Sequence, residues 1–143
     1  MADIFHDFPI YARADPVFTA LSTPDGLDKW WTKSSSGEAK PGAEIGLFFG
    51  PEHQWRARVT RHVPGSEFEI EMTVADNDWL GTRVGFQLET QGDSTKVRFR
   101  HTGWPVENTH WRVSTYCWAM YLRLLRRYIE SAEVVPYEKR LDV

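Results

Sequence analysis

The chain of 143 residues carries a formal net charge of −3, and 14% of its residues are aromatic, including seven tryptophans. We expect one domain over residues 1–143, because a chain of this length buries roughly two thirds of its unfolded surface. Acidic and basic residues are mixed and no basic block occurs, which disfavours a nucleic-acid partner, and no apolar run is long enough to span a membrane.

The first predicted element is a strand over residues 3–12. Ile4, His6, Phe8 and Ile10 alternate along this segment. Successive side chains of a strand point to opposite faces, so these four share one face. His6 is therefore expected to point inward, together with apolar neighbours.

Two short helices and a loop are predicted next. Asp15-Pro16 is typical of a helix start, with Asp15 as the cap, and Thr23-Pro24 is a second start that leads to the pair Trp30-Trp31. Residues 32–43 are polar and rich in Ser and Gly, which predicts a mobile loop.

The middle of the chain predicts an antiparallel meander of five strands, over residues 45–49, 54–63, 67–74, 82–90 and 95–102. One face is apolar, and the other carries charged residues, among which Glu67, Glu69 and Glu71 are expected to be solvated with ordinary acidity. The positions expected to face inward are Trp55, Ala57, Val59, Phe68, Ile70, Met72, Val74, Val84, Phe86, Leu88, Val97, Phe99 and His101.

A long amphipathic helix is predicted over residues 109–131, a stretch without Gly or Pro. Trp111, Trp118, Leu122 and Leu125 recur at helical spacing. A sheet with one apolar face needs a cover, and this helix is the only candidate of sufficient length. The prediction is therefore an α+β fold in which a curved antiparallel sheet of about six strands covers the helix, with two short helices after the first strand.

This order of elements resembles the SRPBCC or START-like helix-grip superfamily, which includes Bet v 1 and polyketide-cyclase domains. More narrowly, the chain resembles the bacterial branch of homologues of the Hsp90 ATPase activator, the AHSA1-like branch. The stretches that carry the resemblance are STPDGLDKWW at 22–31, PG at 41–42, GTRVGFQLE at 81–89, TKVRFRHTGW at 95–104, YCWAMYLRLLRRYIE at 116–130 and VVPYEKRLDV at 134–143.

The resemblance implies a helix-grip fold whose contents differ from member to member. The eukaryotic Hsp90 activator has an additional N-terminal domain on which its stimulation of the chaperone depends, and this chain has no room for one. Hsp90 activation is therefore not carried over, although the resemblance leaves an Hsp90-type chaperone as a candidate partner.

We expect the domain to bind a small, largely apolar molecule in a cavity between the C-terminal helix and the sheet. The sequence leaves open whether the large aromatic side chains line this cavity or fill it. The expected lining has no formally charged side chain, which disfavours an anion, and the loop over residues 32–43 is the expected entrance. The candidate ligand-binding residues are Trp30, Trp31, Phe48, Trp55, Phe68, Met72, Phe86, Phe99, His101, Trp104, Ser114, Trp118 and Tyr121.

Two histidines are weak candidates for catalysis. His6 and His101 both alternate in phase with apolar residues, and the resemblance places the first and last strands side by side, so the two rings could meet. They are alternatively structural histidines with satisfied hydrogen bonds. No HxH, HExxH or CxxC spacing occurs, so we expect neither a metal site nor a cofactor.

Two alternatives to a simple binding domain remain open. One is an enzyme of cyclase or dehydratase type that uses an inward histidine, and the other is an interaction module of co-chaperone type with an exposed apolar patch. The single cysteine, Cys117, and an N-terminus without a secretory signal favour a cytoplasmic location.

Overall fold

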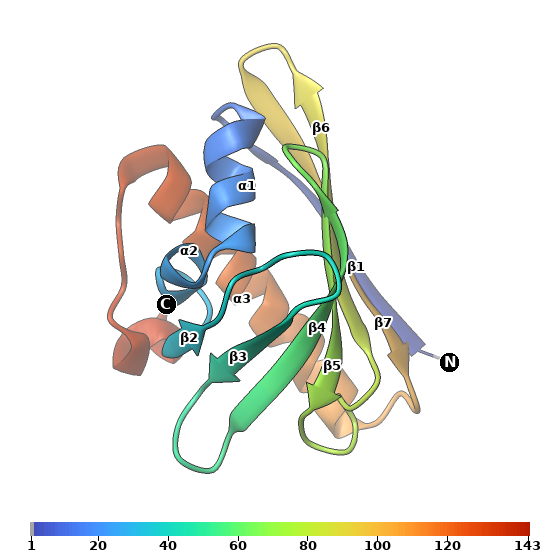
Figure 1. The fold of residues 1–143 in the computed structure, drawn as a ribbon. Coiled ribbons are helices and arrows are strands. Elements are labelled where there is room, and N and C mark those ends of the chain that lie inside the picture. Colours follow the sequence, from blue (N-terminus) through green and yellow to red (C-terminus); the bar gives the residue numbers. More distant parts are fainter. Residues whose placement is uncertain (1) are drawn as a thin grey trace.

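The computed structural model describes residues 2–143. Its elements form one antiparallel sheet, three α-helices and a short 3-10 helix near the C-terminus (Figure 1). In chain order they are β1 (Ala2–Ile10), α1 (Ala14–Ser22), α2 (Pro24–Asp28), β2 (Ser34–Ser36), β3 (Glu44–Phe48), β4 (Gln54–Val63), β5 (Glu67–Val74), β6 (Arg83–Gln91), β7 (Ser94–Trp104), α3 (Thr109–Ser131) and η1 (Tyr137–Asp142).

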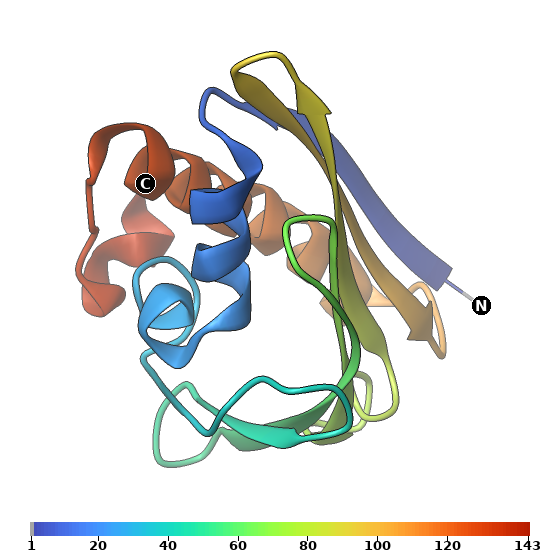
Figure 2. The ribbon, with the colours of Figure 1, turned by 45° about the horizontal axis from the view of Figure 1, so that its top comes forward.

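The seven strands follow the order β1-β7-β6-β5-β4-β3-β2, and every pair is antiparallel. The sheet curves, and all the helices lie on its concave side (Figure 2). This confirms the α+β fold expected from the sequence. The seventh strand is β2, which lies inside the stretch predicted as a loop and pairs with β3 at the edge of the sheet.

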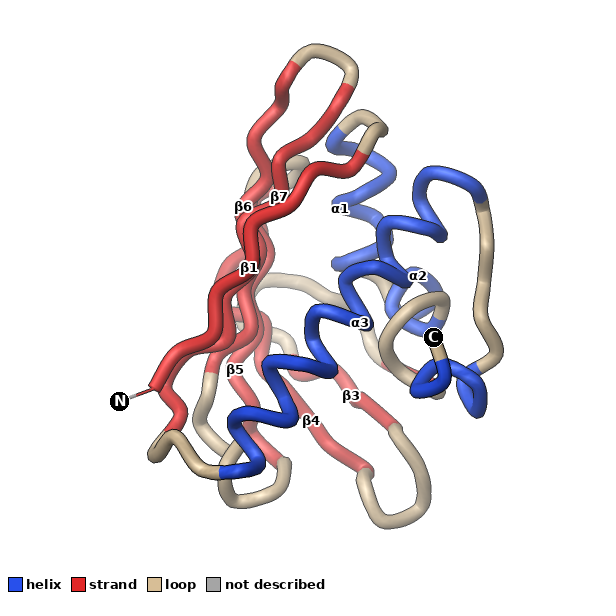
Figure 3. The backbone as a smooth tube through the Cα atoms, turned by 180° about the vertical axis from the view of Figure 1, so that it is seen from behind, coloured by secondary structure: helices blue, strands red, loops and turns tan. Residues whose placement is uncertain are grey.

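The long helix α3 begins and ends at the residues predicted from the sequence. The Asn108 side chain caps its first turn by accepting a hydrogen bond from the Trp111 backbone N–H at 2.9 Å. Trp118, Leu122 and Leu125 are buried on its inner face. Figure 3 shows α3 passing alongside β1, and its C-terminal half approaches α1.

The two short helices follow the predicted order with one difference at a cap. The Thr23 side chain caps α2 by accepting a hydrogen bond from the Gly26 backbone N–H at 3.0 Å. The residue before α1 is Arg13, which makes no side-chain cap, and Asp15 lies in the first turn. The prediction of Asp15 as the cap was therefore wrong, although its carboxylate still suits the positive end of the helix dipole.

The inner face of the sheet is apolar as predicted, with one exception at Val74. This side chain is 47% exposed, because the β4–β5 register shifts between Arg56 and Ala57 and pairs Val74 with Arg56. Such a bulge moves a residue to the other face of the sheet. Val74 therefore points outward.

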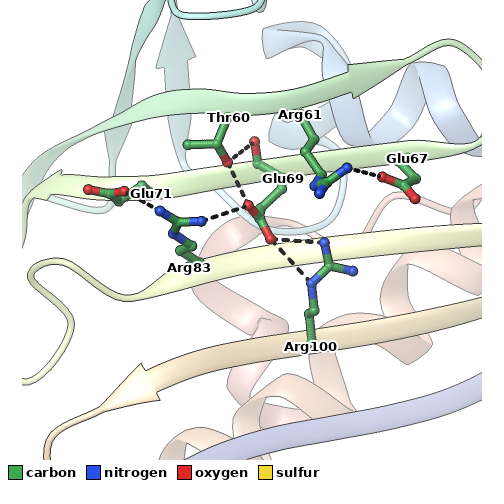
Figure 4. A network of polar contacts seen from close by, with 7 residues as sticks. All are labelled: Thr60, Arg61, Glu67, Glu69, Glu71, Arg83 and Arg100. Carbon is green, nitrogen blue, oxygen red and sulfur yellow. Dashed lines mark hydrogen bonds and ion pairs between the residues drawn. The ribbon is translucent and has the colours of Figure 1, made fainter.

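The outer face of the sheet holds an ion-pair network centred on Glu69 (Figure 4). Only 6% of Glu69 is exposed, and its carboxylate accepts hydrogen bonds from Arg100 at 2.9 and 3.2 Å and from the Thr60 hydroxyl at 2.8 Å. Burial raises the pKa of Glu69, but these hydrogen bonds and the charges of Arg100 and Arg83 outweigh burial and hold the pKa below its ordinary value. The expectation that Glu69 is solvated with ordinary acidity was wrong.

The C-terminal segment folds back across α2 and is held there by Arg140. The buried guanidinium donates to the backbone carbonyls of Asp28 at 2.8 Å, Thr32 at 3.2 Å and Val135 at 3.0 Å. The Tyr137 hydroxyl donates to the Phe49 carbonyl at 3.1 Å. The bond from Arg140 to Thr32 thus holds the first residue of the stretch 32–43, which was expected to be mobile.

Within residues 2–143, no helix is long and apolar enough to cross a membrane.

Candidate functional site

The space between α3 and the centre of the sheet is filled by aromatic rings. The centroids of Trp118 and Phe99 are 4.6 Å apart, those of Trp118 and Trp31 are 5.1 Å apart, and those of Trp30 and Phe86 are 6.2 Å apart. All five side chains are buried. The sequence predicted that these residues would come together, and the structure shows them packed directly against one another.

Trp79 completes this aromatic centre, and the sequence interpretation did not single it out. It comes from the connection between β5 and β6, is 8% exposed, and lies 4.4 Å from the His101 ring and 5.8 Å from Trp118, centroid to centroid. A tryptophan next to Leu80 in a turn that begins with three polar residues was the available signal. The connection is held to the start of α3 because Asp78 accepts hydrogen bonds from His110 at 3.0 Å and Asn108 at 3.2 Å.

Both ring nitrogens of His101 are engaged in the core. Trp118 Nε1 donates to His101 Nδ1 at 3.0 Å, so the ring proton lies on Nε2, which donates to the Thr82 hydroxyl at 2.8 Å. That hydroxyl donates to the Trp79 carbonyl at 2.6 Å. Burial and the charge of His110 lower the pKa of His101 to about 3. The ring is neutral and has no nitrogen free for proton transfer to a ligand.

His6 and His101 do not form the pair that the alternation suggested. In the β1–β7 register, His6 lies opposite Phe99, and His101 lies opposite Ile4. The His6 ring stacks 6.0 Å from Phe99, and its Nε2 lies 3.3 Å from the Thr115 carbonyl of α3. The histidine whose charge acts on His101 is therefore His110 and not His6.

The other candidate ligand-binding residues divide between the core and its margins. Phe48 is half-buried and lines a hollow of about 310 Å³ formed by β2, β3 and β4. Trp55 and Tyr121 are half-buried, and burial and the neighbouring Tyr137 raise the pKa of Tyr121 to about 12. The remaining candidate ligand-binding residues are buried in the core: Phe68, Met72, Trp104 and Ser114.

The open space between α3 and the sheet lies to one side, at the edge strand β1. This groove has a volume of about 490 Å³. Phe8, Ala119 and Leu122 give it an apolar floor, and the half-buried His6 lies at its inner end. The sequence placed His6 and Phe8 on the inward face of the first strand but did not predict the groove, because its existence depends on the distance between α3 and β1.

Charged side chains surround the groove on its α3 side. Arg123, Arg126 and Arg127 come from the C-terminal half of the helix, together with Glu130. Arg126 Nε donates to Glu130 at 2.9 Å and its guanidinium lies 5.0 Å from the centre of the Tyr11 ring. Arg127 lies 3.9 Å from Glu133. The groove therefore combines an apolar floor with a basic margin, whereas the expected site had no charged side chain.

Metal-ligating residues do not cluster in the part of the chain that the structure describes. Over residues 2–143, no group of three or more His, Cys, Asp or Glu side chains is placed to hold a metal ion. Cys117 is a free, half-buried thiol whose pKa is raised by burial.

Comparison with known proteins relates the chain to one family. The sequence model of the family described as "Activator of Hsp90 ATPase homolog 1-like protein" matches residues 11–130. No curated protein sequence matches the chain.

Several solved structures share the fold. The Aha1 dimer from Colwellia psychrerythraea is 32% identical, with a TM-score of 0.83 over 93% of this chain and 99% of that chain. MLL2253 from Mesorhizobium loti is 14% identical, with a TM-score of 0.81 over 93% and 100% of the two chains. CalU16 from Micromonospora echinospora is 18% identical, with a TM-score of 0.74 over 98% and 83%. At these lower identities, MLL2253 and CalU16 bear on the fold alone.

Proposed function

Because the chain belongs to the family of Activator of Hsp90 ATPase homolog 1-like proteins, we propose that it binds a small, largely apolar molecule between its C-terminal helix and its sheet. The observation that carries this proposal is the groove of about 490 Å³ between β1 and α3. Ligand sites are concave, of comparable volume, and combine apolar surface with a few polar groups. In this groove Phe8, Ala119 and Leu122 supply the apolar surface beside charged side chains. A helix-grip domain with such an opening beside its long helix suits a binding role.

We place the ligand at the β1 edge because aromatic rings pack closely against one another at the centre of the fold. Trp31, Phe99 and Trp118 are almost completely buried and in ring contact, so a molecule between them would have to displace packed side chains. Phe8, Ala119 and Leu122 instead line open space. The candidate residues of the aromatic centre then support the groove from behind and do not contact the ligand.

An enzymatic role through an inward histidine has little support in this arrangement. His101 accepts a hydrogen bond from Trp118 and donates one to Thr82 in the closed core. Its ring therefore does not line the groove, and neither ring nitrogen is available to exchange a proton with a ligand. His6 does line the groove, but in residues 2–143 no carboxylate is hydrogen-bonded to its ring. A general acid or base is normally oriented by such a partner.

Self-association is a second candidate function. The relative from C. psychrerythraea is described as a dimer, and α3 of this chain exposes Val113 and 79% of Tyr116. Apolar side chains on an exposed helix face are typical of interaction surfaces. Light scattering after size-exclusion chromatography should then give twice the monomer mass, and Tyr116→Lys should reduce it to the monomer. A monomeric wild-type protein would exclude this candidate.

Native mass spectrometry combined with a groove-filling variant tests the binding function. Freshly purified protein should carry an additional small mass that is released on denaturation. Ala119→Trp should abolish it, because the indole would occupy the groove. Arg112→Trp is the matched control, since it places an indole on an exposed position of the same helix outside the groove, and it should retain the bound mass.

Two results would contradict the proposed function. One is a bound mass that survives in Ala119→Trp, which would place the ligand elsewhere. The other is the lack of both a co-purifying molecule and saturable binding of apolar probes, such as Nile red, to the wild-type protein. Circular dichroism of both variants verifies that they are folded.

A further inference from the structure

We infer that the groove between β1 and α3 takes an amphipathic anion, a molecule with an apolar chain or ring that ends in a carboxylate or phosphate. This inference rests on the proposed function and specifies its ligand class. It follows from the charges at the groove margin, from the apolar floor beneath them, and from the poor suitability of the β1 edge for pairing with another strand.

The groove has more positive than negative charge left over after its internal ion pairs are formed. Glu130 Oε2 accepts hydrogen bonds from the Arg126 Nε–H at 2.9 Å and from the Tyr11 backbone N–H at 2.8 Å. The negative charge of Glu130 is therefore already paired with Arg126. Asp7 also lines the groove, but its carboxylate pairs with Arg98 of β7 at 3.4 Å. Arg123 is exposed and, within residues 2–143, forms no ion pair with any carboxylate. It is the free cation of the groove.

The helix dipole does not explain the position of Arg123. Basic residues are favoured in the last turn of a helix, and the effect falls off within that turn. Arg127 lies near that end, because α3 ends at Ser131, but Arg123 lies one turn before Arg127 and about two turns from the end. Arg123 lines the groove together with Ala119 and Leu122. A guanidinium at that point is suited to bind a carboxylate or phosphate through two parallel hydrogen bonds.

The floor of the groove suits the apolar part of the same ligand. Phe8 of β1 and Leu122 of α3 both line the groove, together with the small side chain of Ala119. An apolar chain lying there would bury surface on both sides while its charged end reached Arg123. The apolar end of an amphiphile would thus contact apolar side chains, while its charged end would contact a guanidinium group.

An extended peptide is a poorer occupant, although β1 is an edge strand. Pro9 has no backbone N–H, and the N–H of Tyr11 already donates to Glu130. Residues 9 and 11 are two apart, so their backbone groups point to the same side of the strand. The carbonyl groups of an added strand would therefore find no free N–H donor at either position. The edge favours a small ligand that uses side chains and not the backbone ladder.

Octanoate and 1-octanol form a matched pair of probes that differ only in the charged group. We expect NMR titration of the wild-type protein to show saturable shifts at Ala119 and Leu122, with octanoate at least about fivefold tighter than 1-octanol, as for one charge-assisted hydrogen bond. Arg123→Gln should remove this preference and leave 1-octanol binding unchanged. Arg112→Gln, which removes an exposed cation elsewhere on α3, should behave as wild type.

The outcomes separate the ligand class from the binding function itself. Equal affinity for octanoate and 1-octanol would overturn the anion inference while leaving the proposed function intact. Binding of neither probe would contradict both. Sedimentation with phosphatidylglycerol vesicles distinguishes a free amphiphile from a lipid headgroup in a bilayer. Binding to vesicles without binding to monomeric octanoate would overturn the inference in favour of a membrane surface.

Discussion

His101 illustrates how a single side chain can be fixed by three hydrogen-bonding partners in series. Trp118, His101, Thr82 and the Trp79 carbonyl form a chain in which each donor has one acceptor. The chain links α3, β7, and the connection between β5 and β6. Because protonation of His101 would remove the acceptor of the Trp118 N–H, the neutral ring is part of the folded core.

The low pKa of His101 predicts acid sensitivity. The ring titrates near 6.5 when unfolded but at about 3 when folded, so below pH 6.5 the unfolded chain binds the additional proton. The stabilisation is fully present above about pH 6.5 and decreases by about 1.4 kcal/mol per pH unit below that value, until the pH approaches the folded pKa.

Urea unfolding at about pH 7 and about pH 5 measures this effect. His101→Gln lacks the titrating group, so its free energy of unfolding should change by about 2 kcal/mol less than that of the wild type over this interval. Equal pH dependence in the two proteins would show that the buried ring is not the source of acid sensitivity.

At the scale of elements, three neighbouring strands are tied together across a glycine. Glu69 of β5 lies opposite Gly85 of β6, and Gly85 lies opposite Arg100 of β7. Without a side chain at residue 85, the Arg100 guanidinium crosses β6 and reaches the Glu69 carboxylate (Figure 4). A Cβ atom at Gly85 would lie 2.6 Å from Arg100 Cζ. The glycine is therefore required by the ion pair and not by a turn.

Gly85→Ala should displace Arg100 and lower the free energy of unfolding by about 1 to 3 kcal/mol, because the buried Glu69 carboxylate would lose two charged donors. Chemical denaturation of a double-mutant cycle with Arg100→Ala checks this. In the Arg100→Ala background the glycine substitution should cost almost nothing. Additive effects of the two substitutions would refute the proposed steric link.

Most elements could be predicted from the sequence because their periodicity is strong. The bounds of α3, β4 and β5 agree with those expected from the alternation and from the helical spacing. The bulge that turns Val74 outward and the pairing of β2 could not be predicted, since both depend on register between strands and not on local composition. The same holds for Glu69, which is buried by neighbouring arginines and not by apolar residues.

At the scale of the whole molecule, the aromatic content was compatible with two outcomes, because the tryptophans could either line a cavity or fill it. In the structure Trp79 enters from a connection and, with Trp30, Trp31, Trp104 and Trp118, packs in the space under α3. Whether aromatic side chains enclose or fill a volume depends on the separation of helix and sheet, which sequence periodicity does not encode. The open volume is therefore at the β1 edge.

The site residues were predictable only in part for the same reason. His6 and Phe8 could be assigned to the inner face of the first strand, and Leu122 to the apolar stripe of the helix. Arg123 and Ala119 could not be assigned to a site, because alone they are typical of a solvated helix face. They border a groove only because the C-terminal half of α3 is separated from β1.

The central claim is that ligand binds in the β1–α3 groove while the aromatic centre remains closed. Methyl-selective NMR during octanoate titration tests it most directly, with the Ala119 and Leu122 methyl groups as reporters of the groove and the buried Met72 methyl group as the reporter of the centre. We expect saturable shifts at Ala119 and Leu122 and an unchanged Met72 resonance. A saturable shift centred on Met72, with Ala119 unaffected, would place the ligand inside the sheet and contradict the claim.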